Sequence, residues 1–209
     1  FLYVNDSQEA PGVKYGRSMP LLRVFSFAGD AMETRVVTPA WAGAPRYTDH
    51  SYRGYAADPE SERLLMLNID ADTGVEHACL LNAAGETLAT GSITFPIRSC
   101  YPQVALKHAA VHVLAIGDIV EPVEAWRQYK FEQTKQEWDY VFRRLFLAWT
   151  PDLRTTPFAD PVELDSVDET GGHITNQDLW IAPDGEAWVL YSRREVASAL
   201  MRDKFFPDK

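Results

Sequence analysis

The sequence contains little cysteine. Its 209 residues include two cysteines, Cys79 and Cys100, which are too few for a disulfide framework. Neither lies in a C-x-x-C spacing of the kind that binds zinc, so we expect two free, partly buried thiols. The sequence also lacks a run of about 18 apolar residues, which a membrane-spanning helix requires, and this absence predicts no membrane partner.

Basic residues are scarce relative to acidic ones. The chain has 20 Lys and Arg against 30 Asp and Glu, which gives a net charge of −10 with neutral histidines. Nucleic-acid binding depends on a basic face that neutralises phosphates. The charge therefore predicts no nucleic-acid partner, although a local cluster of arginines inside an acidic protein is compatible with it.

The sequence also lacks the short motifs that identify common cofactor sites. It has no P-loop, G-x-S-x-G elbow, H-E-x-x-H pair or dinucleotide fingerprint, which argues against nucleotide hydrolysis, metalloprotease and hydride-transfer chemistry. Asp70, Asp72 and Gly74 resemble the start of a calcium loop, but an EF-hand requires glycine and glutamate where this chain has Val75 and Leu81. We therefore predict a solvated loop there, and no cofactor or metal for the chain.

The residues that are present indicate a globular, all-β chain. Apolar residues make up 46% of the sequence and aromatic residues 12%, which suits one folded domain over residues 1–209. Short apolar or alternating segments, separated by Gly, Pro, Asp and Asn, predict strands joined by tight turns. The expected strands are 1–4, 21–27, 34–38, 52–57, 63–69, 77–82, 87–94, 102–106, 111–116, 145–149, 161–164, 178–182 and 187–192.

The turns between these strands recur at regular intervals. One set centres near residues 60, 109 and 185 and the other near 30, 85 and 154, so four strands repeat roughly every 50 to 75 residues. This rhythm is typical of a β-propeller, in which each blade is a four-stranded antiparallel sheet. We predict blade-like units at about 1–47, 48–97, 98–170 and 171–209.

The predicted propeller is incomplete and carries one insertion. Residues 119–140 hold Trp126 and Trp138 among charged residues and fit a short helix or an extended hairpin, of which the alternation in 126–132 favours the hairpin. The chain is expected to open at the second strand of one blade and to stop, at 201–209, within or just after the third strand of another. About three blades result, whereas propellers close with roughly four to eight, so closure would need further sequence or self-association with another chain.

One turn carries a family resemblance. Thr150, Asp152 and Thr156 match the Asp-box pattern Ser/Thr-x-Asp-x-Gly-x-Thr-Trp, with Arg154 in place of the glycine and Phe158 arriving one position after the tryptophan. The turn therefore resembles the Asp-box of sialidase-like (BNR-repeat) β-propellers. The resemblance implies a carbohydrate-active protein in an extracellular or periplasmic compartment, and the alternative is an ordinary Asp-containing β-turn.

Three arginines are candidates for binding a substrate. In a propeller, ligands bind at one mouth of the central channel, where loops lead into the innermost strand of each blade. Arg17, Arg53 and Arg98 stand at such positions, one in each of three units. Converging guanidinium groups would pair with the carboxylate of an acidic oligo- or polysaccharide, and the sialidase resemblance implies an arginine triad of this kind. The alternative for each arginine is a salt bridge on the surface or between blades.

Two histidines and a tyrosine are the catalytic candidates. His50 and His173 stand at the same kind of position, and imidazole titrates near neutrality. With Tyr101 they would supply the base and acid for β-elimination from a uronate, a plan that resembles propeller-shaped polysaccharide lyases. Asn176 is predicted to contact the substrate beside them. The alternative for each histidine is a hydrogen bond at the end of a strand.

Two functional hypotheses follow. The first is hydrolysis or elimination of an acidic glycan at the channel mouth, and the second is a non-catalytic propeller that binds a glycan or a protein. A propeller can support either. Convergence of Arg53, Arg98 and either His50 or His173 in one pocket would favour catalysis, and their separation would favour binding.

Overall fold

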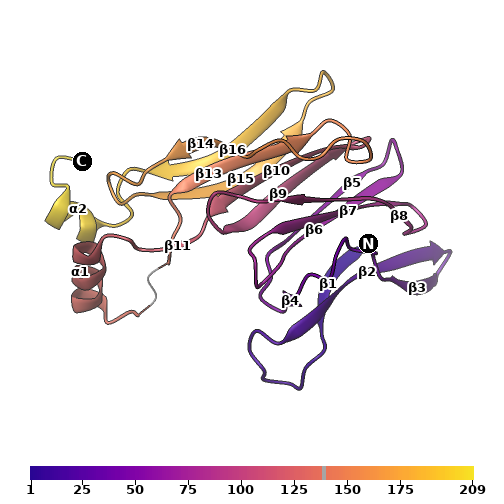
Figure 1. Ribbon diagram of the computed structural model, residues 1–209, viewed down its shortest axis with the longest axis horizontal. Helices are drawn as coiled ribbons and strands as arrows, with labels where there is room; N and C mark the ends of the chain where they lie inside the picture. Colours follow the sequence, from indigo (N-terminus) through magenta and orange to yellow (C-terminus); the bar gives the residue numbers. More distant parts are fainter. Residues whose placement is uncertain (138–139) are drawn as a thin grey trace.

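The computed structural model describes residues 1–137 and 140–209, and it is all-β with two short helices (Figure 1). The predicted all-β class is therefore confirmed. The strands form antiparallel sheets that follow one another along the chain, and none of the described sheets closes on itself. Neither helix in the described part of the chain is long and apolar enough to cross a membrane.

The first sheet contains β1 (Leu2–Ser7), β2 (Arg17–Ala28), β3 (Ala31–Val37) and β4 (Tyr47–Thr48). β2 lies in the centre, with β1 on one side and both β3 and β4 on the other. The β2–β3 hairpin turns at Gly29, whose φ of 60° lies in the left-handed region that glycine adopts without steric cost.

The second sheet is a four-stranded meander. β5 (Arg53–Asp58), β6 (Arg63–Ile69), β7 (Glu76–Asn82) and β8 (Thr87–Ile93) pair in the order of the sequence. The two central strands are buried on both faces, which explains why their sequences are apolar at successive positions. The predicted strands and turns of this sheet match the structure closely.

The third sheet has the order β14-β13-β10-β9. It contains β9 (Ser99–Lys107), β10 (Ala110–Gly117), β13 (Arg144–Thr150) and β14 (Val162–Ser166). The expected turn near residue 109 joins β9 to β10, and the Asp-box-like turn joins β13 to β14.

The insertion between β10 and β13 contains a helix, so of the two predicted alternatives the short helix was right and the favoured hairpin over residues 126–132 was wrong. A short ladder between β11 (Ile119–Val120) and β12 (Tyr140–Val141) frames α1 (Glu124–Thr134). In this helix the Glu124 carboxylate pairs with Arg127 and accepts a hydrogen bond from Gln128, contacts that helical i,i+3 and i,i+4 spacing brings together. The predicted Trp138 lies outside the described residues.

The last sheet has two strands, β15 (His173–Ile181) and β16 (Ala187–Arg194). The prediction of a third strand near residues 201–209 was wrong, because this segment contains α2 (Ala199–Phe205). The Ser198 hydroxyl caps the helix by accepting a hydrogen bond from the Met201 amide at 3.3 Å. Figure 1 shows α2 beside α1, at the end of the molecule opposite β3.

Successive sheets pack face to face through three apolar clusters. The first cluster joins the first and second sheets, the second joins the second and third sheets, and the third joins the third sheet to β15 and β16. β5 lies beside β9, and β9 lies beside β15. The contact between β5 and β9 requires glycine at position 54, since a Cβ there would lie 2.3 Å from Cγ2 of Val104.

The two ends of this stack expose apolar side chains. On the outer face of the first sheet, Phe27 pairs with Met32, and both are exposed. On the last sheet, Trp180 pairs with Trp188, and both are exposed as well. The sheets between them are covered on both faces, so the two outer faces differ from the rest of the stack.

Candidate functional site

A row of aromatic rings joins three of the sheets where their first strands lie side by side. Tyr52 precedes β5, Tyr101 lies in β9, Phe142 precedes β13 and His173 begins β15. The distances between successive ring centroids are 4.7, 5.7 and 5.8 Å. The guanidinium carbon of Arg98 lies 5.1 Å from the Tyr52 ring, so the arginine and the histidine occupy opposite ends of the row.

Tyr101 is held in this row by a strained backbone. Its φ is 50°, a left-handed conformation that is uncommon for a bulky residue. The strand pairing shifts here, because Ile116 pairs with Cys100 whereas Leu114 pairs with Gln103. A bulge of this kind redirects a side chain, and the Tyr101 side chain is half exposed.

Asn176 stabilises the bulge. Its amide nitrogen donates to the carbonyl oxygen of Tyr101 at 2.6 Å and to that of Leu114 at 3.3 Å. Both donors of the buried amide are therefore used on the backbone of β9 and β10. Asn176 positions Tyr101, and its predicted contact with a substrate stays a prediction.

Arg98 is anchored by a buried carboxylate. Its guanidinium pairs with Asp118, whose side chain is buried, and its carbonyl oxygen accepts the Asp118 amide at 2.8 Å. Burial raises the pKa of Asp118, although the charge of Arg98 opposes that effect. The Arg98 guanidinium also lies over the Tyr52 ring, and 44% of its side chain is exposed to solvent.

A second carboxyl group lies behind the row. Glu76 is completely buried, and its Oε1 accepts a hydrogen bond from the Ser99 hydroxyl at 2.8 Å. Its Oε2 has no partner among residues 1–137 and 140–209. Burial raises the pKa of Glu76 to about 8, against smaller opposing effects of Ser99 and Arg98. Sequence reasoning missed Glu76, and its signal was a carboxyl residue directly before a strand segment whose centre, residues 78–81, is apolar.

The prediction that both cysteines are free thiols is confirmed. Cys79 and Cys100 are both free and buried. Burial raises the pKa of the Cys100 thiol, which donates to the carbonyl oxygen of Ile116 at 3.5 Å. Cys100 therefore packs beneath the row as an unreactive thiol.

The pKa of His173 is lowered, which favours the neutral imidazole. Burial lowers its pKa, and the nearby positive charge of Arg194 lowers it further. Its Nε2 lies 3.1 Å from the Thr175 hydroxyl. The imidazole can therefore exchange hydrogen bonds without carrying a positive charge.

The remaining predicted site residues lie elsewhere. Arg53 is exposed, and because it is next to Tyr52 it projects from the opposite face of its strand. The His50 ring lies 4.5 Å from the ring of Tyr15. Arg17 lines a cavity of about 470 Å³ on the first sheet, together with Trp41 and Tyr47. The structure thus brings Arg98, Tyr101, His173 and Asn176 into one region and leaves Arg17, Arg53 and His50 outside it.

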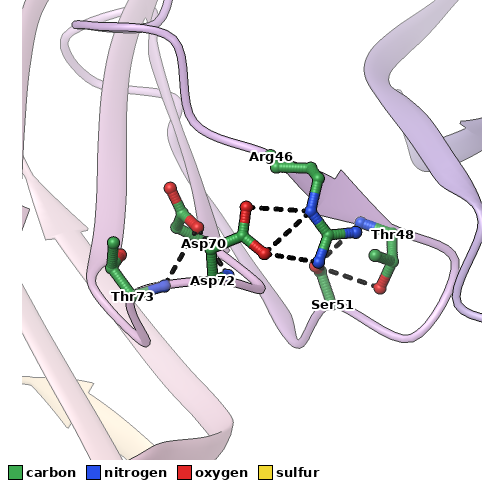
Figure 2. A network of polar contacts seen from close by, with 6 residues as sticks. All are labelled: Arg46, Thr48, Ser51, Asp70, Asp72 and Thr73. Carbon is green, nitrogen blue, oxygen red and sulfur yellow. Dashed lines mark hydrogen bonds and ion pairs between the residues drawn. The ribbon is translucent and has the colours of Figure 1, made fainter.

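The acidic loop that resembles a calcium site is a structural turn (Figure 2). One Asp70 oxygen accepts the backbone amides of Asp72 and Thr73 at 2.8 and 3.2 Å. The Asp72 carboxylate binds the Arg46 guanidinium, with an Nη2 to Oδ1 distance of 2.6 Å. Within the described ranges no three His, Cys, Asp or Glu side chains form a group suited to a metal ion. Asp70 instead holds the loop itself, and Asp72 fastens it to Arg46 in the segment between β3 and β4.

The Asp-box-like turn is held by its own polar side chains. The Thr150 hydroxyl donates to the Thr156 carbonyl at 2.9 Å, and Asp152 accepts the Arg154 amide at 2.9 Å. The Arg154 side chain and amide lower the pKa of Asp152 to about 2. The turn also inserts Leu153 into the core between the second and third sheets.

Comparison with known proteins adds no assignment. No protein-family model matches the chain, and no curated protein sequence matches it. The function is therefore argued from the residues and the geometry described above.

Proposed function

We propose that the chain forms part of a sialidase-like β-propeller and serves as a binding module for an acidic glycan. Three features support the propeller: four-stranded antiparallel meanders, the packing of each sheet on the next, and the adjacency of β5, β9 and β15. In a propeller these three would be the innermost strands of successive blades. The turn at 150–158 adds the family resemblance.

The blade assignment follows the sheets. β5 to β8 form one blade, and β9, β10, β13 and β14 form the next. The first sheet and the β15–β16 pair are the blades at either end, so the assignment comprises three four-stranded sheets and a two-stranded part of a further blade. A further chain, or a second copy, would close the ring by covering the exposed outer faces.

The aromatic row supports glycan binding. The flat face of an aromatic ring packs against the apolar face of a sugar ring, while polar groups at the edge bind its hydroxyl groups. The observation that carries the proposal is Tyr101, which is half exposed on a strained bulge in the middle of the row. Strain of this kind is maintained where the surrounding structure fixes a functional side chain. Arg98, at one end, has donors that suit a carboxylate.

The same geometry favours binding over catalysis. Acid and base must flank one scissile bond, but of the two candidate histidines His50 lies beside Tyr15 and only His173 lies in the row. Arg98, the candidate partner of the substrate carboxylate, lies at the end of the row opposite His173. Hydrolysis or elimination therefore stays a prediction, and the neutral His173 is the group that could act as its base.

The test is binding of acidic and neutral oligosaccharides, measured by calorimetry. We expect acidic oligouronates to bind more tightly than neutral oligosaccharides of equal length, and Tyr101→Ala to weaken binding at least about tenfold, or 1.4 kcal/mol. Tyr15→Ala is the matched control, because Tyr15 has a similar exposure (52% against 50%) and a similar φ (60° against 50°).

Catalysis is measured on the same samples. Absorbance near 235 nm would report unsaturated uronates, and a reducing-end assay would report hydrolysis. Equal effects of Tyr101→Ala and Tyr15→Ala, or no binding across the panel, would refute the binding proposal. Turnover that depends on His173 would replace it with the enzyme hypothesis.

A further inference from the structure

The first sheet contains a cavity at the place where the strand beside β2 is interrupted. β3 pairs with β2 as far as Val37, and β4 resumes the pairing at Tyr47. Pro20 of β2 lies in the gap between them, and proline has no N–H to donate to a neighbouring strand. The segment 38–46 leaves the sheet at this gap. The cavity beside it has a volume of about 470 Å³, within the range of small-molecule sites.

The walls of this cavity are mainly apolar. The loop between β3 and β4 supplies Trp41 and Pro45, and β2 supplies Met19 and Pro20. Trp41 is half-buried, and its ring packs edge to face on Tyr47 with a centroid distance of 5.2 Å. This packing holds the indole in place, so the cavity offers a fixed surface for a flat apolar group.

The charge of the cavity comes from Arg17. None of the other described residues that line it is charged. Arg17 is exposed, and its guanidinium has no hydrogen bond, ion pair or ring contact within the part of the chain that the structure describes. Asp6 lies across the sheet from Met19, but it does not line the cavity or pair with Arg17. The planar N–H donors of this guanidinium are therefore available to a ligand carboxylate.

The overall charge of the chain limits what this arginine can do. A net charge of −10 gives an anion no long-range attraction to the protein. Selectivity for an anion must therefore come from direct contact with Arg17, and an exposed ion pair changes affinity by less than about tenfold. The apolar walls have to supply most of the affinity, so a suitable ligand needs both a carboxylate and an apolar body.

We propose that this cavity binds a small organic anion with a flat apolar body. The carboxylate of the ligand would pair with the Arg17 guanidinium, and its ring would lie against Trp41. None of the described lining residues belongs to the aromatic row. Binding here therefore does not depend on the proposed glycan site.

The test compares three probes on the full chain: 2-naphthoate, the neutral 2-naphthalenemethanol, and acetate. We expect saturable binding of one naphthoate, at least about fivefold tighter than the alcohol, because Arg17 offers charge-assisted hydrogen bonds. Acetate should bind much more weakly than naphthoate, since it lacks the apolar body. The preference for the acid should persist at about 0.15 M salt, because a direct contact is shorter than the screening length of about 8 Å.

Two matched pairs of variants locate the site. Arg17→Gln should abolish the preference for naphthoate over the alcohol, whereas Arg23→Gln, on the same strand but outside the cavity, should keep it. Met19→Glu should weaken naphthoate binding at least about fivefold, because it places a carboxylate on the same face of β2 as Arg17. Met32→Glu is its control, since Met19 and Met32 are both exposed and only Met19 lines the cavity.

Two further measurements complete the test. Intermolecular NOEs from naphthoate should reach the Trp41 indole in the unaltered protein. Tyr101→Ala should leave naphthoate binding unchanged, which separates this site from the glycan proposal. Absence of naphthoate binding, equal affinity for the acid and the alcohol, NOEs to other tryptophans only, or equal effects of Met19→Glu and Met32→Glu would each overturn the proposal.

Discussion

Replacing Glu76 by glutamine should stabilise the protein at alkaline pH. The carboxyl group is completely buried, and its pKa is raised from 4.5 to about 8. At about 1.4 kcal/mol for each pH unit, this shift corresponds to a cost on the order of 5 kcal/mol for keeping the ionised group in the fold. Glutamine has the shape and neutrality of the protonated form, and its side-chain oxygen can still accept the bond from Ser99.

The sign of the pH dependence follows from proton binding. Between pH 4.5 and 8 the folded state keeps the proton on Glu76 while the unfolded state releases it. The stability that this proton gives is complete below the unfolded pKa and is lost as the pH rises through about 8. The unaltered protein should therefore lose stability from pH 5 to pH 9 relative to Glu76→Gln.

The assay is urea unfolding of both proteins at intervals from pH 5 to pH 9. The difference in the free energy of unfolding should be small at pH 5 and should grow by several kcal/mol toward pH 9, with similar m-values. Glu33→Gln, on the exposed strand β3, is the control and should give a difference that is nearly constant with pH. Parallel curves for the unaltered protein and Glu76→Gln would refute the reasoning.

Two further predictions concern residues that hold the sheets and the site. Leu153→Ala should lower the free energy of unfolding by about 2 to 3 kcal/mol, at the low end for buried leucines because a turn can relax, whereas exposed Leu164→Ala should change it by less than about 0.5 kcal/mol. Equal urea midpoints for these two variants would contradict the buried role of Leu153. Asn176→Ala should cost about 1 to 3 kcal/mol by leaving two backbone carbonyls unpaired, and it should weaken glycan binding by releasing Tyr101. Calorimetry would test the second effect, and unchanged glycan affinity would show that Asn176 does not position Tyr101.

The sequence predicted the sheets better than the connections between them. Turn residues such as Gly85 mark where strands end, so the predicted ends of the four strands in the second sheet lie within about two residues of the observed ends. α1 was read as a hairpin because it has no buried residue, and a helix without a buried face has no clear apolar period. α2 was missed because one buried residue, Met201, is too little to define a helical face.

Some residues of the candidate site were predicted from the sequence and others were not. Arg98, Tyr101 and His173 share a region because each stands where a first strand begins or is about to begin. Arg53 does not join them, because neighbouring residues in a strand face opposite sides and Tyr52 already faces the row. Glu76 could not be anticipated, since a carboxyl group is normally exposed and its burial depends on residues far along the chain.

The uncovered faces at the two ends of the stack have a consequence for how the molecule opens. An inner sheet is held by two neighbours, but an outer sheet is held by only one, so the contact energy per strand is lowest at the extremities. Amide exchange should therefore begin in β3 and β16 and advance inward, and β6, β7 and β10 should exchange last. The outer sheets should therefore unfold locally before the inner ones, and a further sheet packed on an exposed outer face should slow amide exchange there.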